Sequence, residues 1–340
     1  MDLLHIDALR VSFRVEDEDL HVLDGVDLHV TPGEVVGVVG ESGCGKSVMA
    51  MSVLRLHPEP PARIGGGRIL WKGRDLLTLS PAALRRVRGR EIAMIFQEPM
   101  TSLNPVYTVG DQIAEAVALH RAMGHDEAWD VAVEMLRRVH IADPERRAED
   151  YPHQLSGGMK QRVMIAMALS CDPELLIADE PTTALDVTIQ AEILDLLRSL
   201  ITPSPAASGP GMAAPGAERR PERQMSMVLI THDLGVVAET CDRVVVMYAG
   251  RIVESAPAAE LFNAPTHPYT RGLLRALPGL LPGRLANIEG MVPHPRDYPT
   301  GCRYVARCPH RSPECATRPE STAVSATHAV WCHHPQEGPL

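Results

Sequence analysis

A glycine-rich segment constrains the fold of this chain more than any other part of it. The segment reads Gly40-Glu41-Ser42-Gly43-Cys44-Gly45-Lys46-Ser47 and fits the pattern G-x-x-x-x-G-K-[ST]. It follows an apolar, β-branched run at 34–39 and precedes a helix-compatible run at 48–56. A strand, such a loop and a helix in this order wrap backbone N–H groups around phosphate oxygens. We therefore expect a phosphate-binding loop, in which Lys46 reaches the β- and γ-phosphates and the Ser47 hydroxyl helps to hold Mg²⁺.

The composition is that of an ordinary globular chain. Its 340 residues can form one large domain and a smaller one, and 45% of them are hydrophobic against 22% charged. No run approaches the roughly 18 to 20 consecutive apolar residues that span a bilayer, and the first residues lack the layout of a signal peptide. A net charge of −10 argues against nucleic acid as a partner. We expect a cytosolic protein.

Periodicity predicts a chain of the α/β class. Antiparallel strands are expected over 3–13 and 20–30, where polar and apolar residues alternate. Buried strands are expected at 34–39, 91–96 and 175–178, a short strand at 68–71 that Gly65-Gly66-Gly67 introduces, and further strands at 227–230 and 243–247. Helices are expected over 109–140, within 152–170 and over 186–200. Strands that alternate with helices favour a sheet with parallel pairing.

Two segments depart from this pattern. Residues 202–224 are rich in proline, glycine and alanine without apolar periodicity, which is typical of a mobile surface loop. The chain beyond about Pro257 is also rich in proline and weakly periodic. It is interpreted as an appended domain whose order depends on something other than a large core.

Further motifs follow the loop in a fixed order. They are Gln97 after a strand; Leu155-Ser156-Gly157-Gly158-Met159-Lys160-Gln161-Arg162; Asp179-Glu180 after a strand; Ala184-Leu185-Asp186; and Thr231-His232-Asp233. Together they resemble the Q-loop, signature, Walker B, D-loop and switch-histidine motifs of ABC ATPases. This resemblance covers residues 1 to about 255.

The resemblance implies a fold and a set of roles. The expected fold is a P-loop ABC ATPase domain at 1–256, with a RecA-like core, an antiparallel β subdomain and a helical signature subdomain at about 98–170. Asp179 and Gln97 would join Ser47 around Mg²⁺, which prefers one or two carboxylates with phosphate and water oxygens. Glu180 would polarise the attacking water, and His232 would contact the γ-phosphate. Phe13 would stack on adenine, with packing in the core as its alternative.

The signature motif also implies an assembly. In the family, Ser156, Gly157 and Gly158 bind the γ-phosphate that the opposite ATPase domain holds, and Asp186 belongs to the D-loop beside it. This chain carries one such set. The resemblance therefore implies a dimer that ATP binding closes and hydrolysis releases.

Segments outside the core motifs resemble one subfamily. Residues 97–105, 266–274 (with His267-Pro268-Tyr269) and 301–332 are similar to parts of the oligopeptide, dipeptide and nickel importers, and most similar to their D-type ATPase. The resemblance implies a sister F-type ATPase or a second copy, two transmembrane permeases and, indirectly, an extracytoplasmic substrate-binding protein. It places the chain peripherally at the cytoplasmic face of the membrane, with residues 257–340 as the importer extension.

Cysteines are unevenly distributed. Cys44, Cys171 and Cys241 are scattered, as buried packing residues are. The extension contains the other four, which are Cys302, Cys308, Cys315 and Cys332. Structural zinc favours closer cysteine pairs, so this wider spacing favours a [4Fe–4S] cluster that helps to fold the tail. A zinc ion and no metal at all are the alternatives.

The function that these observations favour is ATP hydrolysis that energises the import of dipeptides or oligopeptides, with ATP, Mg²⁺ and a [4Fe–4S] cluster as cofactors. The same machinery could instead import nickel or another small solute. Soluble ABC proteins of translation or DNA repair are a further alternative, but they usually have two ATPase domains or long coiled coils. A soluble redox sensor that uses the cysteine tail to gate ATP binding is an alternative of another class.

Overall fold

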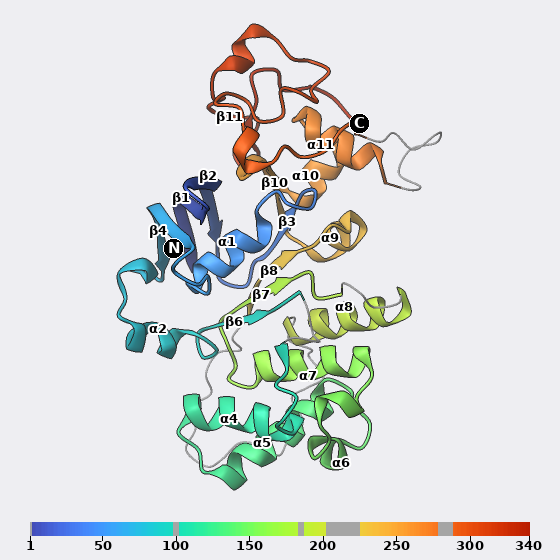
Figure 1. The fold of residues 1–340 in the computed structure, drawn as a ribbon. Helices are drawn as coiled ribbons and strands as arrows, with labels where there is room; N and C mark the ends of the chain where they lie inside the picture. Colours follow the sequence, from blue (N-terminus) through green and yellow to red (C-terminus); the bar gives the residue numbers. More distant parts are fainter. Residues whose placement is uncertain (1, 98–101, 183–186, 202–224, 278–287) are drawn as a thin grey trace. The chain divides into compact units, whose positions relative to one another are not determined.

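The computed structural model describes residues 2–97, 102–182, 187–201, 225–277 and 288–340. The chain forms two compact units, one of residues 1–79 and 228–340 and the other of residues 80–227. Figure 1 shows their elements. The predicted loop at 202–224 and the predicted D-loop with Asp186 lie outside the described residues. Within the described ranges, no helix combines the length and the apolar character that crossing a membrane requires.

The first unit contains a four-stranded antiparallel sheet. Its strands lie in the order β2-β1-β4-β5 and are β1 (Leu4–Val15), β2 (Glu18–Val30), β4 (Ala62–Trp71) and β5 (Arg74–Asp75). β1 and β2 pair from Leu4 opposite Val30 to Val15 opposite Glu18. The antiparallel pair that the alternating pattern predicts is therefore confirmed.

The prediction for β4 is wrong at its start. The strand begins at Ala62, so the glycine run lies inside it instead of introducing it. The pairing of β4 with β1 shifts register between Asp7 and Arg10, which marks a β-bulge. Gly67 has a φ of 89°, and a Cβ at this position would lie 2.6 Å from the carbonyl oxygens of Asp7 and Ala8. Glycine lets the strand pass this bulge.

A second sheet of this unit positions the glycine-rich loop. The strands of this sheet that are described with the first unit lie in the order β11-β12-β10-β9-β3-β8. They are β3 (Val35–Val39), β8 (Ser226–Ile230, which leads in from the second unit), β9 (Arg243–Tyr248), β10 (Arg251–Pro257), β11 (Ser321–Ala323) and β12 (Ala329–Trp331). All five residues of β3 are buried, and β3 pairs in parallel with β9. The short helices of this unit include α1 (Lys46–Val53), which follows β3, η1 (Leu76–Thr78), which follows β5, and α9 (Leu234–Thr240), which connects β8 to β9.

The chain beyond 257 continues this sheet. Val330 of β12 pairs with Glu254 of β10, and β11 pairs with β12. The other elements here are α10 (Ala258–Asn263), α11 (Pro268–Arg275), η3 (Pro295–Asp297) and η4 (Pro313–Ala316). Leu261, Leu274 and Val330 are fully buried, so this part of the chain contributes side chains to an apolar core. Sequence periodicity does not reveal these core residues, because each short element supplies only one or two buried apolar side chains.

The second unit combines two parallel strands with most of the longer helices. The strands β6 (Ile92–Ile95) and β7 (Leu175–Asp179) pair in parallel. The helices are α2 (Pro81–Val87), α4 (Val109–Arg121), α5 (His125–Arg138), α6 (Pro144–Ala148), η2 (Pro152–Gln154), α7 (Gly157–Leu169) and α8 (Val187–Ile201). The helical prediction for 109–140 is confirmed, with a break where Ala122 takes a φ of 53°. The predicted α/β class is confirmed as well.

Candidate functional site

The glycine-rich loop connects β3 to α1 in the first unit. Gly45 caps α1 with a φ of 105°, a left-handed conformation that favours glycine, and a Cβ there would lie 2.7 Å from a Leu23 methyl carbon. The N–H of Met49 donates to the Gly45 carbonyl at 2.9 Å and begins the helical hydrogen bonding. The strand-loop-helix arrangement that the pattern predicts is therefore present.

Lys46 places a positive charge at the centre of this loop. Its ammonium donates to the carbonyl oxygens of Gly40 at 2.7 Å and Glu41 at 3.1 Å, and the residue is 5% exposed. Ser47 is half-buried in the first turn of α1. A cation beside a helix N-terminus and a glycine-rich backbone attracts phosphate oxygens. The neighbouring Cys44 thiol is buried, and burial raises its pKa, which agrees with packing and not with a reactive thiol.

Two more predicted site residues belong to the first unit. Phe13 on β1 is half-buried, and its ring meets His57 edge-on, with 5.4 Å between the centroids and 87° between the planes. His232 follows β8 and is exposed. Its neighbour Asp233 fixes this segment by accepting from the Gly235 N–H at 2.9 Å and by donating its own N–H to Thr231 Oγ1 at 3.0 Å. A capped helix thus holds the residue that the motif singles out.

The second unit holds the predicted acidic pair at the end of β7. Asp179 is the last residue of the strand and is 3% exposed. Glu180 follows with a φ of 46°, a conformation that costs a non-glycine residue roughly 1 to 2 kcal/mol. Gln97, which comes after β6, donates from Nε2 to Glu180 Oε2 at 3.2 Å. The structure thus brings together two predicted residues, and backbone strain of this kind clusters at functional sites.

The signature motif lies at the start of α7. Ser156 caps this helix by accepting from the Met159 N–H at 3.3 Å, and Ser156 and Gly157 are exposed. Gly158 is buried, and a Cβ there would lie 3.1 Å from Ile189. Gln161 donates to the Pro181 carbonyl at 2.5 Å and so ties the helix to the segment after Glu180. An exposed serine and glycine at a helix N-terminus present donors to solvent.

The predicted residues therefore fall into two sets. The glycine-rich loop, Phe13 and His232 belong to the first unit, whereas Gln97, Asp179, Glu180 and the signature belong to the second.

The four cysteines of the extension lie in one region of the first unit. The Cys302 N–H donates to the Cys315 carbonyl at 2.9 Å. Burial raises the pKa of Cys302, Cys308 and Cys332, the last to about 12, and neighbouring thiols of the set add to each shift. Among the described residues, which include all four cysteines, no three Cys, His, Asp or Glu side chains are arranged to hold a metal ion. Neither the predicted cluster nor a zinc ion is supported by this geometry.

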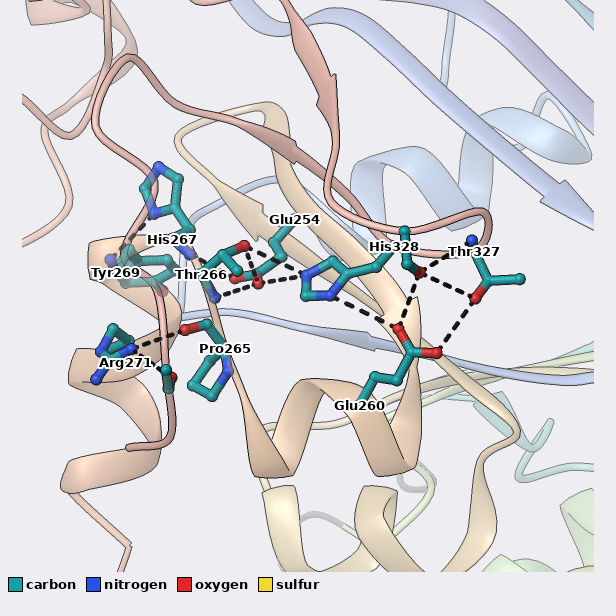
Figure 2. A network of polar contacts seen from close by, with 11 residues as sticks. Glu254, Glu260, Pro265, Thr266, His267, Tyr269, Arg271, Thr327 and His328 are labelled. Atoms are coloured by element: carbon teal, nitrogen blue, oxygen red, sulfur yellow. Dashed lines mark hydrogen bonds and ion pairs between the residues drawn. The ribbon is translucent and has the colours of Figure 1, made fainter.

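A buried polar network that the sequence analysis does not single out joins the extension to β10 (Figure 2). The Glu254 carboxylate is fully buried and accepts from the Thr266 N–H at 2.6 Å, the Thr266 hydroxyl at 2.7 Å, the His267 N–H at 3.0 Å and His328 Nε2 at 2.8 Å. Burial raises the pKa of Glu254, but these hydrogen bonds, His328's first among them, bring it below its ordinary value. Glu254 thus remains an anion that its partners satisfy.

Comparisons with known proteins agree with this geometry. A family model described as ABC transporter matches residues 23–183, and one described as the C-terminal region of oligopeptide/dipeptide transporters matches residues 253–315. A Sinorhizobium fredii relative named as a probable peptide ABC transporter ATP-binding protein is 51% identical in an alignment 339 residues long that covers 98% of this chain and 96% of the relative. A Brucella melitensis relative named as a putative peptide import ATP-binding protein is 48% identical in an alignment 349 positions long, gaps included, that covers 98% of each chain.

Comparison with solved structures indicates the same class of protein. A dimeric ATP-binding cassette bound to ADP and phosphate is 26% identical, with a TM-score of 0.62 over 75% of this chain and 98% of that one. The fold and its motifs thus define an ATP-binding cassette. The chain belongs to the ATP-binding subunits of ABC transporters, in the oligopeptide/dipeptide transporter family. ATP hydrolysis is therefore its enzymatic activity, with ATP and Mg²⁺ as the expected cofactors.

Proposed function

We propose that this chain energises the import of dipeptides and oligopeptides by hydrolysing ATP beside a membrane permease pair. The observation that carries this proposal is the match of residues 253–315 to the C-terminal region of oligopeptide/dipeptide transporters, in a chain that also contains the cassette. The names of two relatives that match nearly the whole chain support it. These names favour neither nickel import nor a soluble sensor.

The proposed ATP chemistry follows the motifs. Residues 40–47 bind the phosphates, with Lys46 on the β- and γ-phosphates. Ser47, Asp179 and Gln97 supply oxygen ligands to Mg²⁺, whose preference is for hard oxygen donors. Glu180 orients and polarises the attacking water. The hydrogen bond between Gln97 and Glu180 supports this pairing of roles, because it links a proposed Mg²⁺ ligand to the proposed base.

The remaining predicted residues take the roles that the family resemblance implies. His232 contacts the γ-phosphate, and Phe13 stacks on adenine. Ser156 and Gly157, which are exposed at the start of α7, bind the γ-phosphate of the opposite subunit together with Gly158. Asp186 acts in the D-loop.

The proposed assembly is a dimer with a sister F-type ATPase or a second copy of this chain. The dimeric solved cassette supports a dimer as such. Two transmembrane permeases bind the dimer at the cytoplasmic face of the membrane, and a substrate-binding protein delivers peptide from outside. Within the chain, residues 1–256 form the ATPase domain, with a helical subdomain at about 98–170, and residues 257–340 form the importer extension.

A [4Fe–4S] cluster on Cys302, Cys308, Cys315 and Cys332 remains part of the proposal. The described side chains are not grouped around a metal ion, but one local feature is compatible with cluster ligands: Cys302, Cys308 and Cys332 each accept a hydrogen bond from the backbone N–H two residues later. Such bonds stabilise thiolate ligands. Four thiolates on a cluster bind different iron atoms and need not surround one point, as four zinc ligands do.

Iron and sulfide analysis tests the cluster. Protein purified without oxygen is expected to contain iron and acid-labile sulfide, both lost in Cys308→Ser and retained in Cys171→Ser. Cys171 is a buried cysteine of the second unit and provides the control. Wild-type protein without iron or sulfide would end this part of the proposal.

Uptake assays test the cargo. Cells that carry the wild-type chain or Glu180→Gln are given a labelled dipeptide, a labelled longer peptide or Ni²⁺. Loss of peptide uptake in the variant, with Ni²⁺ uptake unchanged, is the expected result. Peptide import would be contradicted if the variant lost only Ni²⁺ uptake, or if its uptake of all three substrates were unchanged.

A further inference from the structure

The His-Pro-Tyr segment of the extension contacts the glycine-rich loop directly. His267 caps α11 by accepting from the Tyr269 N–H at 3.0 Å, and Pro268 is the first residue of the helix. This turn directs the buried Tyr269 side chain to the loop, where its hydroxyl accepts from the Glu41 backbone N–H at 2.8 Å. The tyrosine thereby fixes the second residue of the proposed phosphate site.

A second contact reaches the side chain of the same residue. The Arg307 guanidinium donates to both carboxylate oxygens of Glu41, at 2.5 Å and 2.9 Å. The Arg307 side chain is only 6% exposed, against 29% for Glu41. Its hydrogen bonds to Glu41, and secondarily to Tyr248, raise the pKa of Arg307. A two-point pair with one partner buried fixes geometry far better than an exposed ion pair does.

The arginine is itself held in place from several sides. It donates to the carbonyl oxygens of Glu289 at 2.8 Å and Gly290 at 3.2 Å. Beneath it, the Tyr248 ring meets Tyr269 at 4.7 Å and Tyr304 at 5.1 Å between centroids. Aromatic pairs in this geometry form a rigid support. The extension therefore reaches Glu41 from a packed surface.

A third route runs through the turn between β9 and β10. Arg303 of the extension donates to the Ala249 carbonyl, and the next N–H, that of Gly250, donates to the Cys44 carbonyl at 2.8 Å. The extension thus contacts the loop at Glu41 directly and supports it at Cys44 through one intervening turn.

We propose that Arg307 and Tyr269 are positioning residues that hold Glu41, and with it the glycine-rich loop, in the conformation that binds ATP. This inference rests on the proposed role of residues 40–47 as the phosphate site. The pair with Arg307 neutralises the Glu41 carboxylate, which would otherwise repel phosphate, and the Tyr269 hydroxyl fixes the Glu41 N–H. The importer extension is then part of the nucleotide site and sets its affinity.

The test is a nucleotide affinity measured in two backgrounds. A fluorescent ATP analogue is titrated into purified wild type, Arg307→Met, Glu41→Gln and the double variant, with Mg²⁺ present. Arg307→Met is expected to weaken binding about tenfold in the wild-type background. When Arg307→Met is combined with Glu41→Gln, it is expected to weaken binding of the analogue less than about twofold relative to Glu41→Gln alone, because the charge that Arg307 neutralises is gone.

Other variants keep the test decisive. Arg307→Lys retains the charge but not the two-point contact, and roughly threefold weaker binding is expected. Tyr269→Phe leaves the Glu41 N–H without its acceptor and is expected to weaken binding by a similar factor. Arg318→Met is the control: Arg318 anchors the same extension to the carbonyl oxygens of Asp24 and Gly25 and is 42% exposed. Its affinity is expected to equal that of wild type.

The outcomes separate this inference from the proposed function. Wild-type protein that does not bind the analogue would contradict the phosphate site itself. Wild-type binding together with unchanged affinity in Arg307→Lys and Tyr269→Phe would overturn only the positioning role. An equal loss from Arg307→Met in both backgrounds would also overturn it, because a merely structural arginine would not depend on the charge of Glu41.

Discussion

The Tyr269 hydroxyl accepts a hydrogen bond from the Glu41 N–H at 2.8 Å, across 228 residues of sequence. One partner lies in the glycine-rich loop and the other in the His-Pro-Tyr segment of the extension. Because Arg307 binds the side chain of the same Glu41, two parts of the extension converge on one loop residue. The extension is therefore integrated with the loop, and variants that remove these contacts to Glu41 are expected to change nucleotide binding.

Replacing Glu254 by Gln is expected to destabilise the fold by about 2 to 3 kcal/mol, because a buried carboxylate that accepts several hydrogen bonds is replaced by an amide that cannot accept all of them. Glu254 and His328 are 0% and 3% exposed, so water cannot compensate. Urea unfolding measures the change. Glu260→Gln is the matched control: Glu260 also faces His328, at 3.8 Å, but is 44% exposed (Figure 2), and a change below about 1 kcal/mol is expected. Equal effects of the two variants would refute the buried role of Glu254.

The buried His267 predicts that the stability of the fold depends on pH. Burial lowers its pKa from 6.5 to about 4, and Nδ1 already accepts from the Tyr269 N–H. Because the unfolded chain binds the proton first as the pH falls, the stability contribution is complete above about pH 6.5 and is lost toward pH 4. Between pH 7.5 and pH 5 the expected loss is about 2 kcal/mol.

His267→Asn isolates this contribution, because asparagine keeps the helix cap and does not titrate. The variant is expected to lose about 2 kcal/mol less than wild type between the two pH values. His125→Asn, at a side chain 77% exposed, is expected to behave as wild type. If His267→Asn lost as much stability as wild type between pH 7.5 and pH 5, the buried imidazole would not govern the pH dependence of stability in this range.

Removing the ammonium of Lys46 is expected to weaken ATP binding at least tenfold, because a charge-assisted contact to the phosphates is lost. Lys46→Met keeps the apolar stem, and its affinity can be compared by titration with the same fluorescent analogue. Lys72→Met, at a lysine over the Trp71 ring, is the control and should bind normally. Equal binding by both variants would exclude Lys46 from the site.

Local patterns predict the elements that carry the cassette motifs. The loop lies between β3 and α1, the acidic pair ends β7, and the signature opens α7, because strand burial, helix spacing and capping are encoded within a few residues. The roles in binding and catalysis remain predictions. The pairing of Gln97 with Glu180 follows from the parallel alignment of β6 and β7, which brings the ends of both strands to one edge.

Long-range contacts could not be predicted in this way. Nothing near Arg307 indicates that it binds Glu41, which is 266 residues away. Likewise, Glu254 resembles any strand residue until Thr266 and His328 fold onto it. The position of Gly67 depends on a bulge in another strand, so the pattern misplaces the start of β4. In each case the deciding partner is distant in sequence.

The most direct test of the central claim is ATP turnover and assembly in Glu180→Gln. If Glu180 activates the attacking water, turnover should fall at least about 100-fold, while ATP binding persists and the closed dimer accumulates on size-exclusion chromatography with ATP and Mg²⁺. Glu174→Gln, at a glutamate just before β7, is the control and should turn over normally. Normal turnover in Glu180→Gln, without an ATP-stabilised dimer, would contradict the claim.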